Sequence, residues 1–107
     1  MSKINIENIK KLVKNGNVRW TNHVILRLIQ REISQLEVEE AILNGEIIEE
    51  YENDYPYPSC LIYGCSIKNK ILHIVCGITE SEVWIITAYH PNIIKWNEDL
   101  KTRKEKN

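Results

Sequence analysis

The sequence has few of the residues from which several kinds of functional site are built. It contains four glycines and neither of the patterns G-x-G-x-x-G and G-x-x-x-x-G-K-[ST], which excludes a glycine-rich phosphate-binding loop. Its three cysteines, Cys60, Cys65 and Cys76, form no C-x-x-C pair. A closed disulfide framework and a four-thiolate zinc site are therefore both excluded, and we expect reduced, buried cysteines that pack as small apolar residues.

The chain also lacks long apolar runs and an excess of positive charge. No run approaches the ~18 apolar residues of a membrane span, and residues 1–16 have no continuous apolar core of a secretory signal. We therefore expect a cytoplasmic protein that does not associate with membranes. Lys and Arg together number 14 and Asp and Glu 15, so no overall positive field attracts nucleic acid. Any anion site must be local.

What is present is the composition of one globular domain, with 107 residues that are 43% hydrophobic and 27% charged. The first half has helical periodicity with local start and stop signals. It predicts three helices: one capped by Asn5 and ending at Asn15-Gly16, one from Thr21 to Arg31 or Glu32, and one from the capping box Ser34-x-x-Glu37 to Asn44-Gly45.

After Gly45 the periodicity becomes that of strands. Short connections between them, at 68–69 and 79–82, are typical of antiparallel hairpins. The predicted fold class is α+β, with N-terminal helices packed on one face of a four-stranded antiparallel sheet. Residues 98–107 are expected to form a polar tail, and residues 101–107, which are basic and have no apolar periodicity, are expected to fray. The predicted strands are Ile47-Ile48, Leu61 to Ile67, Ile71 to Ile78 and Val83 to Tyr89.

Three polar residues of the second predicted helix form one stripe. His23, Arg27 and Arg31 are spaced four residues apart, and the apolar residues of this helix fall on the other side. Guanidinium groups suit bidentate recognition of phosphate, and a neutral imidazole in the first turn of a helix can act as a general base. The alternative is a solvated polar face in which the arginines pair with acidic side chains.

His73 lies in the middle of an apolar run, where strand alternation places it on the same face as Ile71 and Val75. Two interpretations are open: a buried residue with satisfied hydrogen bonds, or an acid-base group whose pKa is shifted by its surroundings. Tyr51 and Tyr89 end the first and last predicted strands. Each either packs at the rim of the sheet or stacks on an RNA base.

The pattern of possible ligands disfavours a metal site. His73 and Cys76 are three residues apart on a strand, so they point to opposite faces and cannot easily converge on zinc together with His90. The acidic run over residues 46–54 lacks a carboxylate pair from separate elements, and we interpret it as a charged edge that keeps the domain soluble. We therefore predict no metal and no cofactor.

A series of spaced motifs runs along residues 20–97. Together these motifs resemble a bacterial family known as DUF4258. The series comprises His23-x3-Arg27-x3-Arg31, Ile33-Ser34, Asn44-Gly45-Glu46-Ile47-Ile48-Glu49-Glu50-Tyr51, Tyr57-Pro58-Ser59, Leu72-His73-Ile74-Val75, and Thr87-Ala88-Tyr89-His90-Pro91 with Trp96.

This resemblance implies a fold and an activity. Members of the family are placed among small metal-independent ribonuclease folds that include RelE-like and MqsR-like toxins, in which helices pack on an antiparallel sheet. Many look like the toxin of a bacterial toxin-antitoxin pair, often with a zinc-finger antitoxin of the MqsA type. The expected partners are therefore RNA, either as free mRNA or at the ribosome, and a cognate antitoxin protein.

The resemblance nominates five site residues: catalytic His23, His73 and Tyr89, and phosphate-binding Arg27 and Arg31. The implied reaction is endoribonuclease attack of a ribose 2'-hydroxyl on its own 3'-phosphate, which needs a base, an acid and cations but no metal. One histidine would be the base and the other the acid, in an order that the sequence leaves open. The alternative function is a non-catalytic domain on the same fold that binds protein or nucleic acid, which the near-neutral charge favours.

Overall fold

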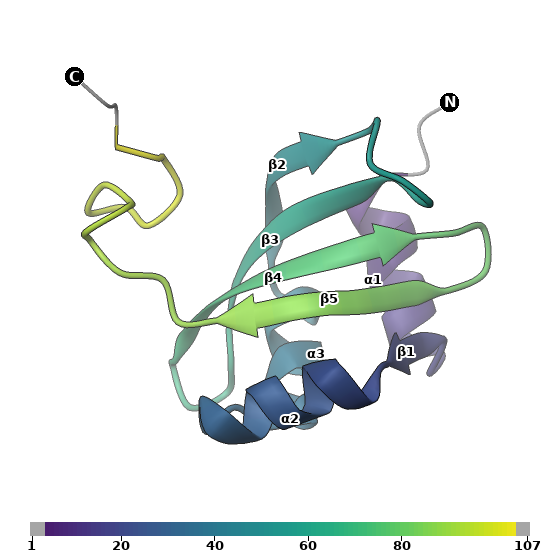
Figure 1. Ribbon diagram of the computed structural model, residues 1–107, viewed down its shortest axis with the longest axis horizontal. Coiled ribbons are helices and arrows are strands. Elements are labelled where there is room, and N and C mark those ends of the chain that lie inside the picture. Colours follow the sequence, from purple (N-terminus) through teal and green to yellow (C-terminus); the bar gives the residue numbers. More distant parts are fainter. Residues whose placement is uncertain (1–3, 105–107) are drawn as a thin grey trace.

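The computed structural model describes residues 4–104 and contains three helices and a five-stranded sheet (Figure 1). The strand order is β1-β5-β4-β3-β2. β1 pairs with β5 in parallel, and every other neighbouring pair is antiparallel. The elements are α1 (Ile6–Lys14), β1 (Val18–Trp20), α2 (Asn22–Gln30), α3 (Gln35–Leu43), β2 (Glu46–Tyr51), β3 (Ser59–Cys65), β4 (Ile71–Ile78) and β5 (Val83–Tyr89).

Local capping interactions start the three helices where the sequence predicts them. The Asn5 side chain accepts hydrogen bonds from two backbone N–H groups of the first turn of α1, and Thr21 accepts one from Val24. Ser34 and Glu37 form the complete capping box of α3, in which each side chain accepts from the other residue's backbone N–H. These bonds satisfy donors that have no partner within a helix, which explains why the boundaries follow from sequence alone.

The prediction of four antiparallel strands is correct for β2 to β5 and wrong for the sheet as a whole. A fifth strand, β1, lies at the edge with Val18, Arg19 and Trp20 opposite Val83, Trp84 and Ile85 of β5. It makes the sheet mixed. A strand of three residues is too short to show alternation, and its partner is distant in the sequence, so no local signal distinguishes it from the approach to α2.

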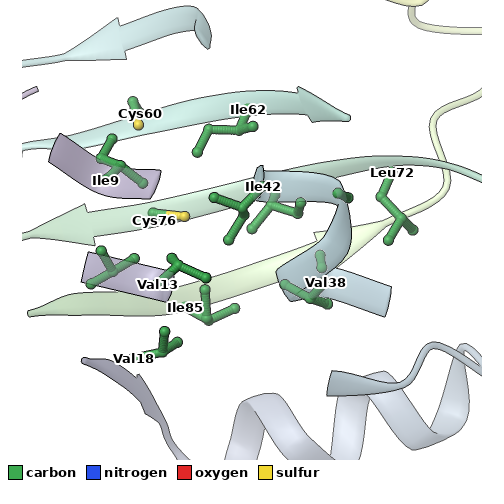
Figure 2. Close-up of a cluster of buried hydrophobic side chains, with 14 of the residues drawn as sticks. Ile9, Val13, Val18, Val38, Ile42, Cys60, Ile62, Leu72, Cys76 and Ile85 are labelled. Atoms are coloured by element: carbon green, nitrogen blue, oxygen red, sulfur yellow. The ribbon is translucent and has the colours of Figure 1, made fainter. Parts of the chain in front are cut away.

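The helix face of the sheet is the face that α1 and α3 cover, and it holds the main apolar core (Figures 1 and 2). Contact between α3 and β3 is close: a Cβ placed on Gly64 would lie 1.9 Å from the backbone oxygen of Ala41. Cys60 and Cys76 are buried and reduced, as predicted, whereas Cys65 is only half-buried. Residues from both layers shown in Figure 2 are Ile9, Val13, Val38 and Ile42 from the helices and Ile62, Leu72, Cys76 and Ile85 from the strands.

The opposite face of the sheet is crossed by residues 91–104, which we call the C-terminal segment. The expectation that residues 101–107 fray is wrong for residues 101–104, and residues 105–107 lie outside the described part of the chain. Within the segment, Asn97 N–H donates to Thr102 O (2.8 Å) and Lys104 N–H donates to Lys95 O (3.0 Å). The segment starts after β5 and reaches Glu49 of β2 through Arg103. The segment is ordered although its residues 101–104 are polar and lack periodicity, because side chains of β2 and β4 bind Leu100, Lys101 and Arg103.

No helix within residues 4–104 is long and apolar enough to cross a membrane.

Candidate active site

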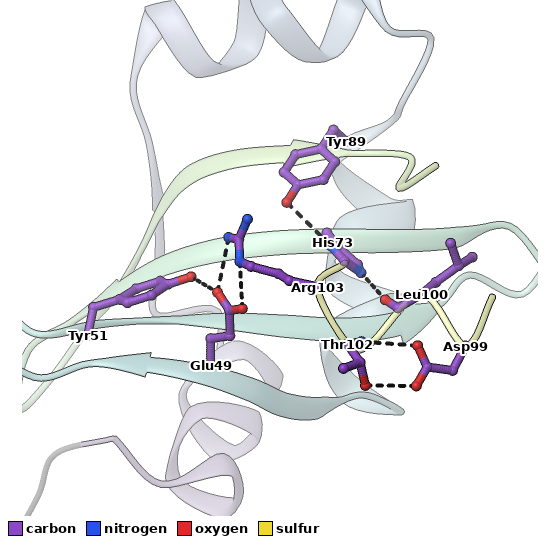
Figure 3. Close-up of polar contacts among 8 residues, drawn as sticks. All are labelled: Glu49, Tyr51, His73, Tyr89, Asp99, Leu100, Thr102 and Arg103. Carbon is purple, nitrogen blue, oxygen red and sulfur yellow. Dashed lines mark hydrogen bonds and ion pairs between the residues drawn. The ribbon is translucent and has the colours of Figure 1, made fainter. Parts of the chain in front are cut away.

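His73 occupies the centre of the opposite face, where the C-terminal segment covers it (Figure 3). Its side chain is 0% exposed. The Trp96 ring packs edge-on against the imidazole at a centroid distance of 4.5 Å, and the Tyr89 ring does so at 5.4 Å. The predicted alternation is confirmed, because Ile71 and Val75 are half-buried while the intervening neighbours of His73 face the helices.

Hydrogen bonding determines the tautomer of His73. Its Nε2 atom lies 2.6 Å from the backbone oxygen of Leu100, and a carbonyl oxygen can only accept, so Nε2 carries the proton. Nδ1 is then the acceptor, and the Tyr89 hydroxyl, 3.3 Å away, donates to it. Burial lowers the pKa of His73 more than the bond to Leu100 raises it. The resting imidazole is therefore neutral, and the lone pair of its Nδ1 atom accepts the hydrogen bond from the Tyr89 phenol.

Tyr89 connects this buried histidine to a pocket. The pocket has a volume of about 350 Å³, and its lining residues are Tyr89, Pro91, Asn92, Lys95, Trp96 and Arg103. Burial raises the pKa of Tyr89, while the positive charges of Arg103 and Arg31 act in the other direction. The pocket thus presents a phenol hydroxyl beside two cationic side chains, an arrangement that suits an anion.

Beside His73 lies a second polar group, formed by Glu49, Tyr51 and Arg103. Arg103 donates from Nε and from Nη2 to the two oxygens of Glu49, at 2.8 and 3.1 Å, and its guanidinium lies 4.6 Å from the centroid of the Trp96 ring. The Tyr51 hydroxyl donates to the same carboxylate. Burial would raise the pKa of Glu49, but the bonds from Arg103 and Tyr51 outweigh it and lower the pKa. The two hydrogen bonds to Glu49 therefore hold the Arg103 guanidinium in one orientation at the pocket wall.

Arg31 reaches the same region from α2. The helix α2 ends at Gln30 with Arg31 as its C-cap, Glu32 adopts a φ of 57°, and Ile33 N–H donates to Leu28 O at 2.9 Å, which together form a Schellman motif. From that position Arg31 Nη1 donates to Thr87 Oγ1 (3.0 Å) and to Ala88 O (2.8 Å) of β5. Arg31 is thus anchored next to Tyr89 with its other N–H donors unused by these bonds.

The structure separates the remaining predicted residues from this cluster. His23 is exposed in the first turn of α2, and Arg27 is exposed one turn before Arg31. An α-helix rises 1.5 Å per residue, so His23 lies about 12 Å along the axis from Arg31. Within residues 4–104 no contact joins His23 to His73. The fold therefore brings His73 to Tyr89 and Arg31 to the residues beside Tyr89, whereas it leaves His23 apart from them.

The possible ligands of a metal remain apart. His73 faces the C-terminal segment and Cys76 faces α1 and α3, as strand alternation predicts. His90 Nδ1 instead pairs with the Ile71 backbone oxygen at 3.1 Å. In the described part of the chain no three His, Cys, Asp or Glu side chains are grouped so that they could hold a metal ion.

Sequence reasoning missed Glu49, Arg103 and Trp96 as parts of the site. From the sequence alone, Glu49 belongs to the charged edge and Arg103 to the polar tail. A usable signal was present in β2, where Glu49 and Tyr51 are two residues apart and therefore share a face. No comparable signal marks Arg103, because its partner lies on a strand 54 positions earlier.

Residues 20–90 match the family model described as "Domain of unknown function (DUF4258)". The match spans well over half of the chain, so the protein belongs to the DUF4258 family, as its motifs predict. Comparison with curated proteins and with solved structures gives no significant match. The family match includes Arg31, Glu49, His73 and Tyr89, whereas Arg103 lies beyond it.

Proposed function

We propose that the protein is a metal-independent endoribonuclease, the toxin component of a bacterial toxin-antitoxin pair, with its active site at the pocket beside Tyr89. The observation that carries this proposal is the hydrogen bond from the Tyr89 hydroxyl to the neutral, buried His73, at the wall of a pocket that Lys95 and Arg103 also line. The family resemblance described above points to the same reaction class.

The Tyr89–His73 pair supplies the base. As the substrate 2'-hydroxyl attacks the adjacent phosphorus, its proton passes to the Tyr89 oxygen while the phenol proton passes to His73 Nδ1. The new 2'-oxygen–phosphorus bond replaces the bond to the 5'-oxygen, which leaves with a proton from the Lys95 ammonium. The Leu100 carbonyl, already bonded to Nε2, stabilises the imidazolium that forms. A 2',3'-cyclic phosphate is the product.

Cations around the pocket stabilise the charge that develops on the phosphate. Arg103 is held by Glu49, and Arg31 by Thr87 and the Ala88 carbonyl, so both guanidinium groups are positioned before substrate binds. Preorganised donors are more effective than mobile ones, since they need no reorientation during the reaction. Arg27, exposed one turn away on α2, extends this positive surface. This scheme differs from the two-histidine mechanism that the family resemblance implies, because His23 takes no part in the chemistry.

Cleavage of a mixed-sequence RNA by the purified protein in EDTA tests the proposal. We expect products that end in a 2',3'-cyclic phosphate, and no cleavage at positions that carry 2'-deoxyribose. Tyr89→Phe should lower the rate by about 10²- to 10⁴-fold, the range for loss of a general acid-base group. His73→Gln should do the same.

His23→Gln is the matched control, since it makes the same change in a histidine outside the cluster. It should cleave at a rate close to that of the unmodified protein. Absence of cleavage by the unmodified protein, or equal losses in His23→Gln and His73→Gln, would contradict the proposed site.

A second candidate function, a non-catalytic RNA-binding domain, is favoured by the burial of His73, whose two ring nitrogens both have protein partners. In that case the pocket would retain RNA through its cations, and the Tyr89–His73 bond would only stabilise the sheet. Retention of intact RNA together with the absence of cyclic-phosphate products identifies this alternative.

The proposal includes a protein partner, the cognate antitoxin. On α2, Leu26 and Ile29 are 60% and 67% exposed, and on α3 Leu36 is 63% exposed. Exposed apolar side chains of this size are candidates for a protein contact. Co-expression with the product of the adjacent gene should give a stable complex. Leu26→Glu should prevent formation of that complex and leave RNA cleavage by the free protein unchanged.

A further inference from the structure

A second pocket lies on the opposite face, at the other end of the sheet from Tyr89. It has a volume of about 230 Å³, and aromatic rings of Tyr55, Tyr57 and Trp84 line it together with Asp54 and Gly77. The loop between β2 and β3 supplies the two tyrosines and Asp54, whereas β4 supplies Gly77 and β5 supplies Trp84. Tyr55 is 95% exposed, so its ring is not used in packing.

Packing does not require a glycine at position 77, whereas it does require one at positions 45 and 64. A Cβ on Gly64 or on Gly45 would collide with backbone atoms at 1.9 and 2.6 Å, so packing against Ala41 requires both glycines. A Cβ on Gly77 would meet only side-chain atoms, of Ile86 at 3.6 Å and Trp84 at 3.8 Å, which is ordinary contact. Glycine inside a strand weakens it, and often marks a place where a ligand approaches closely. In this protein the missing side chain of Gly77 leaves the base of the second pocket open to a ligand.

The two pockets share one face because of an irregularity in the sheet. His73 and Gly77 are separated by four positions on β4, so they lie on the same face of the sheet at a distance of about 13 Å. On β5 their partners Tyr89 and Trp84 are five residues apart, and the register shift between Val75 and Cys76 restores the phase. A short single strand can thus contact both pockets along one surface.

We propose that this aromatic pocket binds a guanine base of single-stranded RNA a few nucleotides from the bond that is cleaved, an inference that rests on the proposed function. The rings of Tyr55 and Trp84 stack on the base, which is how sequence-specific RNA sites bind unstacked bases. Asp54 selects the base. One of its oxygens accepts from the Ser59 hydroxyl, and the carboxylate can accept further bonds. Of the four RNA bases, guanine presents two adjacent N–H donors on one edge, which match a carboxylate.

Nucleoside binding to the full chain tests this site without depending on catalysis. The probes are guanosine, adenosine, cytidine and uridine, followed through the Gly77 amide and Trp84 indole signals in NMR spectra. We expect guanosine to shift both signals at about tenfold lower concentration than the other three, the size of effect expected for a charge-assisted hydrogen bond. Asp54→Asn should remove that difference. Equal effects of all four nucleosides, or shifts produced by a proline-rich peptide and not by nucleosides, would overturn the proposal.

Three variants connect the pocket to RNA cleavage. Tyr55→Leu removes an exposed ring and should raise KM for RNA about tenfold, with a smaller change in kcat. Gly77→Val fills the base of the pocket and should do the same; if it fails to fold, Tyr55→Leu still decides the matter. The control is Ile67→Ala, which removes an apolar side chain that is 79% exposed and lies outside the pocket.

Two outcomes separate the two proposals. RNA cleavage with an unchanged KM in Tyr55→Leu refutes the guanine site alone, whereas guanosine binding without cleavage refutes the proposed ribonuclease alone.

Discussion

The two faces of the sheet are covered by different kinds of contact. On the helix face, α1 and α3 bury aliphatic side chains against the strands, and Gly64 lets the α3 backbone touch β3. On the opposite face, the C-terminal segment is held by Arg103 on Glu49, by Lys101 on Glu46 at 3.2 Å and by the bond between His73 and Leu100. Apolar burial contributes most of the free energy of folding, whereas exposed ion pairs contribute little. The helix face therefore contributes most of the stability, and the opposite face, where the buried Trp96 ring packs on His73, is left for a site.

The largest effect should come from adding the same methyl group to each face. Gly64→Ala should lower the free energy of unfolding by about 3 kcal/mol or more, because its Cβ would overlap the backbone of α3. Gly77→Ala should instead raise it by about 0.5 to 1 kcal/mol, since the new methyl has room and alanine loses less entropy in a strand. Denaturant unfolding of both variants measures the difference. Losses of equal size would mean that the two faces are packed alike.

Removal of a helix cap should have an intermediate effect confined to the helix face. Ser34→Ala eliminates the oxygen that accepts from Glu37 N–H, at 3.0 Å, and should cost roughly 0.5 to 2 kcal/mol. Glu37→Ala, which removes the reciprocal half of the capping box, should cost less because the bond to the N-cap side chain is the main capping interaction. Chemical denaturation provides the measurement. A midpoint unchanged by Ser34→Ala would show that tertiary packing alone holds the start of α3.

Acidification should weaken the opposite face in two steps. The pKa of His73 is lower in the folded protein, so its contribution is complete above the unfolded value of ~6.5 and declines as the pH falls toward the folded pKa. The lowered pKa of Glu49 adds a second decline below its unfolded value of ~4.3. Unfolding midpoints between about pH 4 and 7 should show the first step in the unmodified protein and not in His73→Gln. An identical decline in that variant would assign the effect to other groups.

The smallest effect on global stability should come from Glu49→Gln. Exposed ion pairs typically contribute about 0.2 to 1 kcal/mol, and Arg103 is more than half exposed, so the change in unfolding free energy should stay below ~1 kcal/mol. Local opening should nevertheless increase. Hydrogen exchange at the Asn97 and Lys104 amides, which close the C-terminal segment, should accelerate while exchange in β3 and β4 stays unchanged. Uniform acceleration in both regions would show that the segment unfolds only with the whole domain.

Much of the fold follows from the sequence because its determinants are local. Caps at Asn5, Thr21 and Ser34 satisfy backbone donors within three residues, so each helix start is visible in a short window. Strands β2 to β5 follow from alternation and short turns, which also placed His73 on the face away from Cys76. The family motifs name Arg31, His73 and Tyr89, and in the fold His73 bonds to Tyr89 while Arg31 bonds to the two residues before Tyr89.

Tertiary structure alone decided the fifth strand, the place of Arg103 and the tautomer of His73. In each case the two partners are far apart along the chain, so no short stretch of sequence indicates that they meet. β1 becomes a strand only when β5 offers an edge to pair with. Arg103 becomes part of the site only when the C-terminal segment crosses the sheet to reach Glu49. The tautomer of His73 likewise depends on the Leu100 carbonyl, 27 positions away, since only the folded chain brings an acceptor to Nε2 and leaves Nδ1 for Tyr89. The residue types and their periodicity were therefore present in the sequence, whereas their pairing into one site was a property of the folded protein.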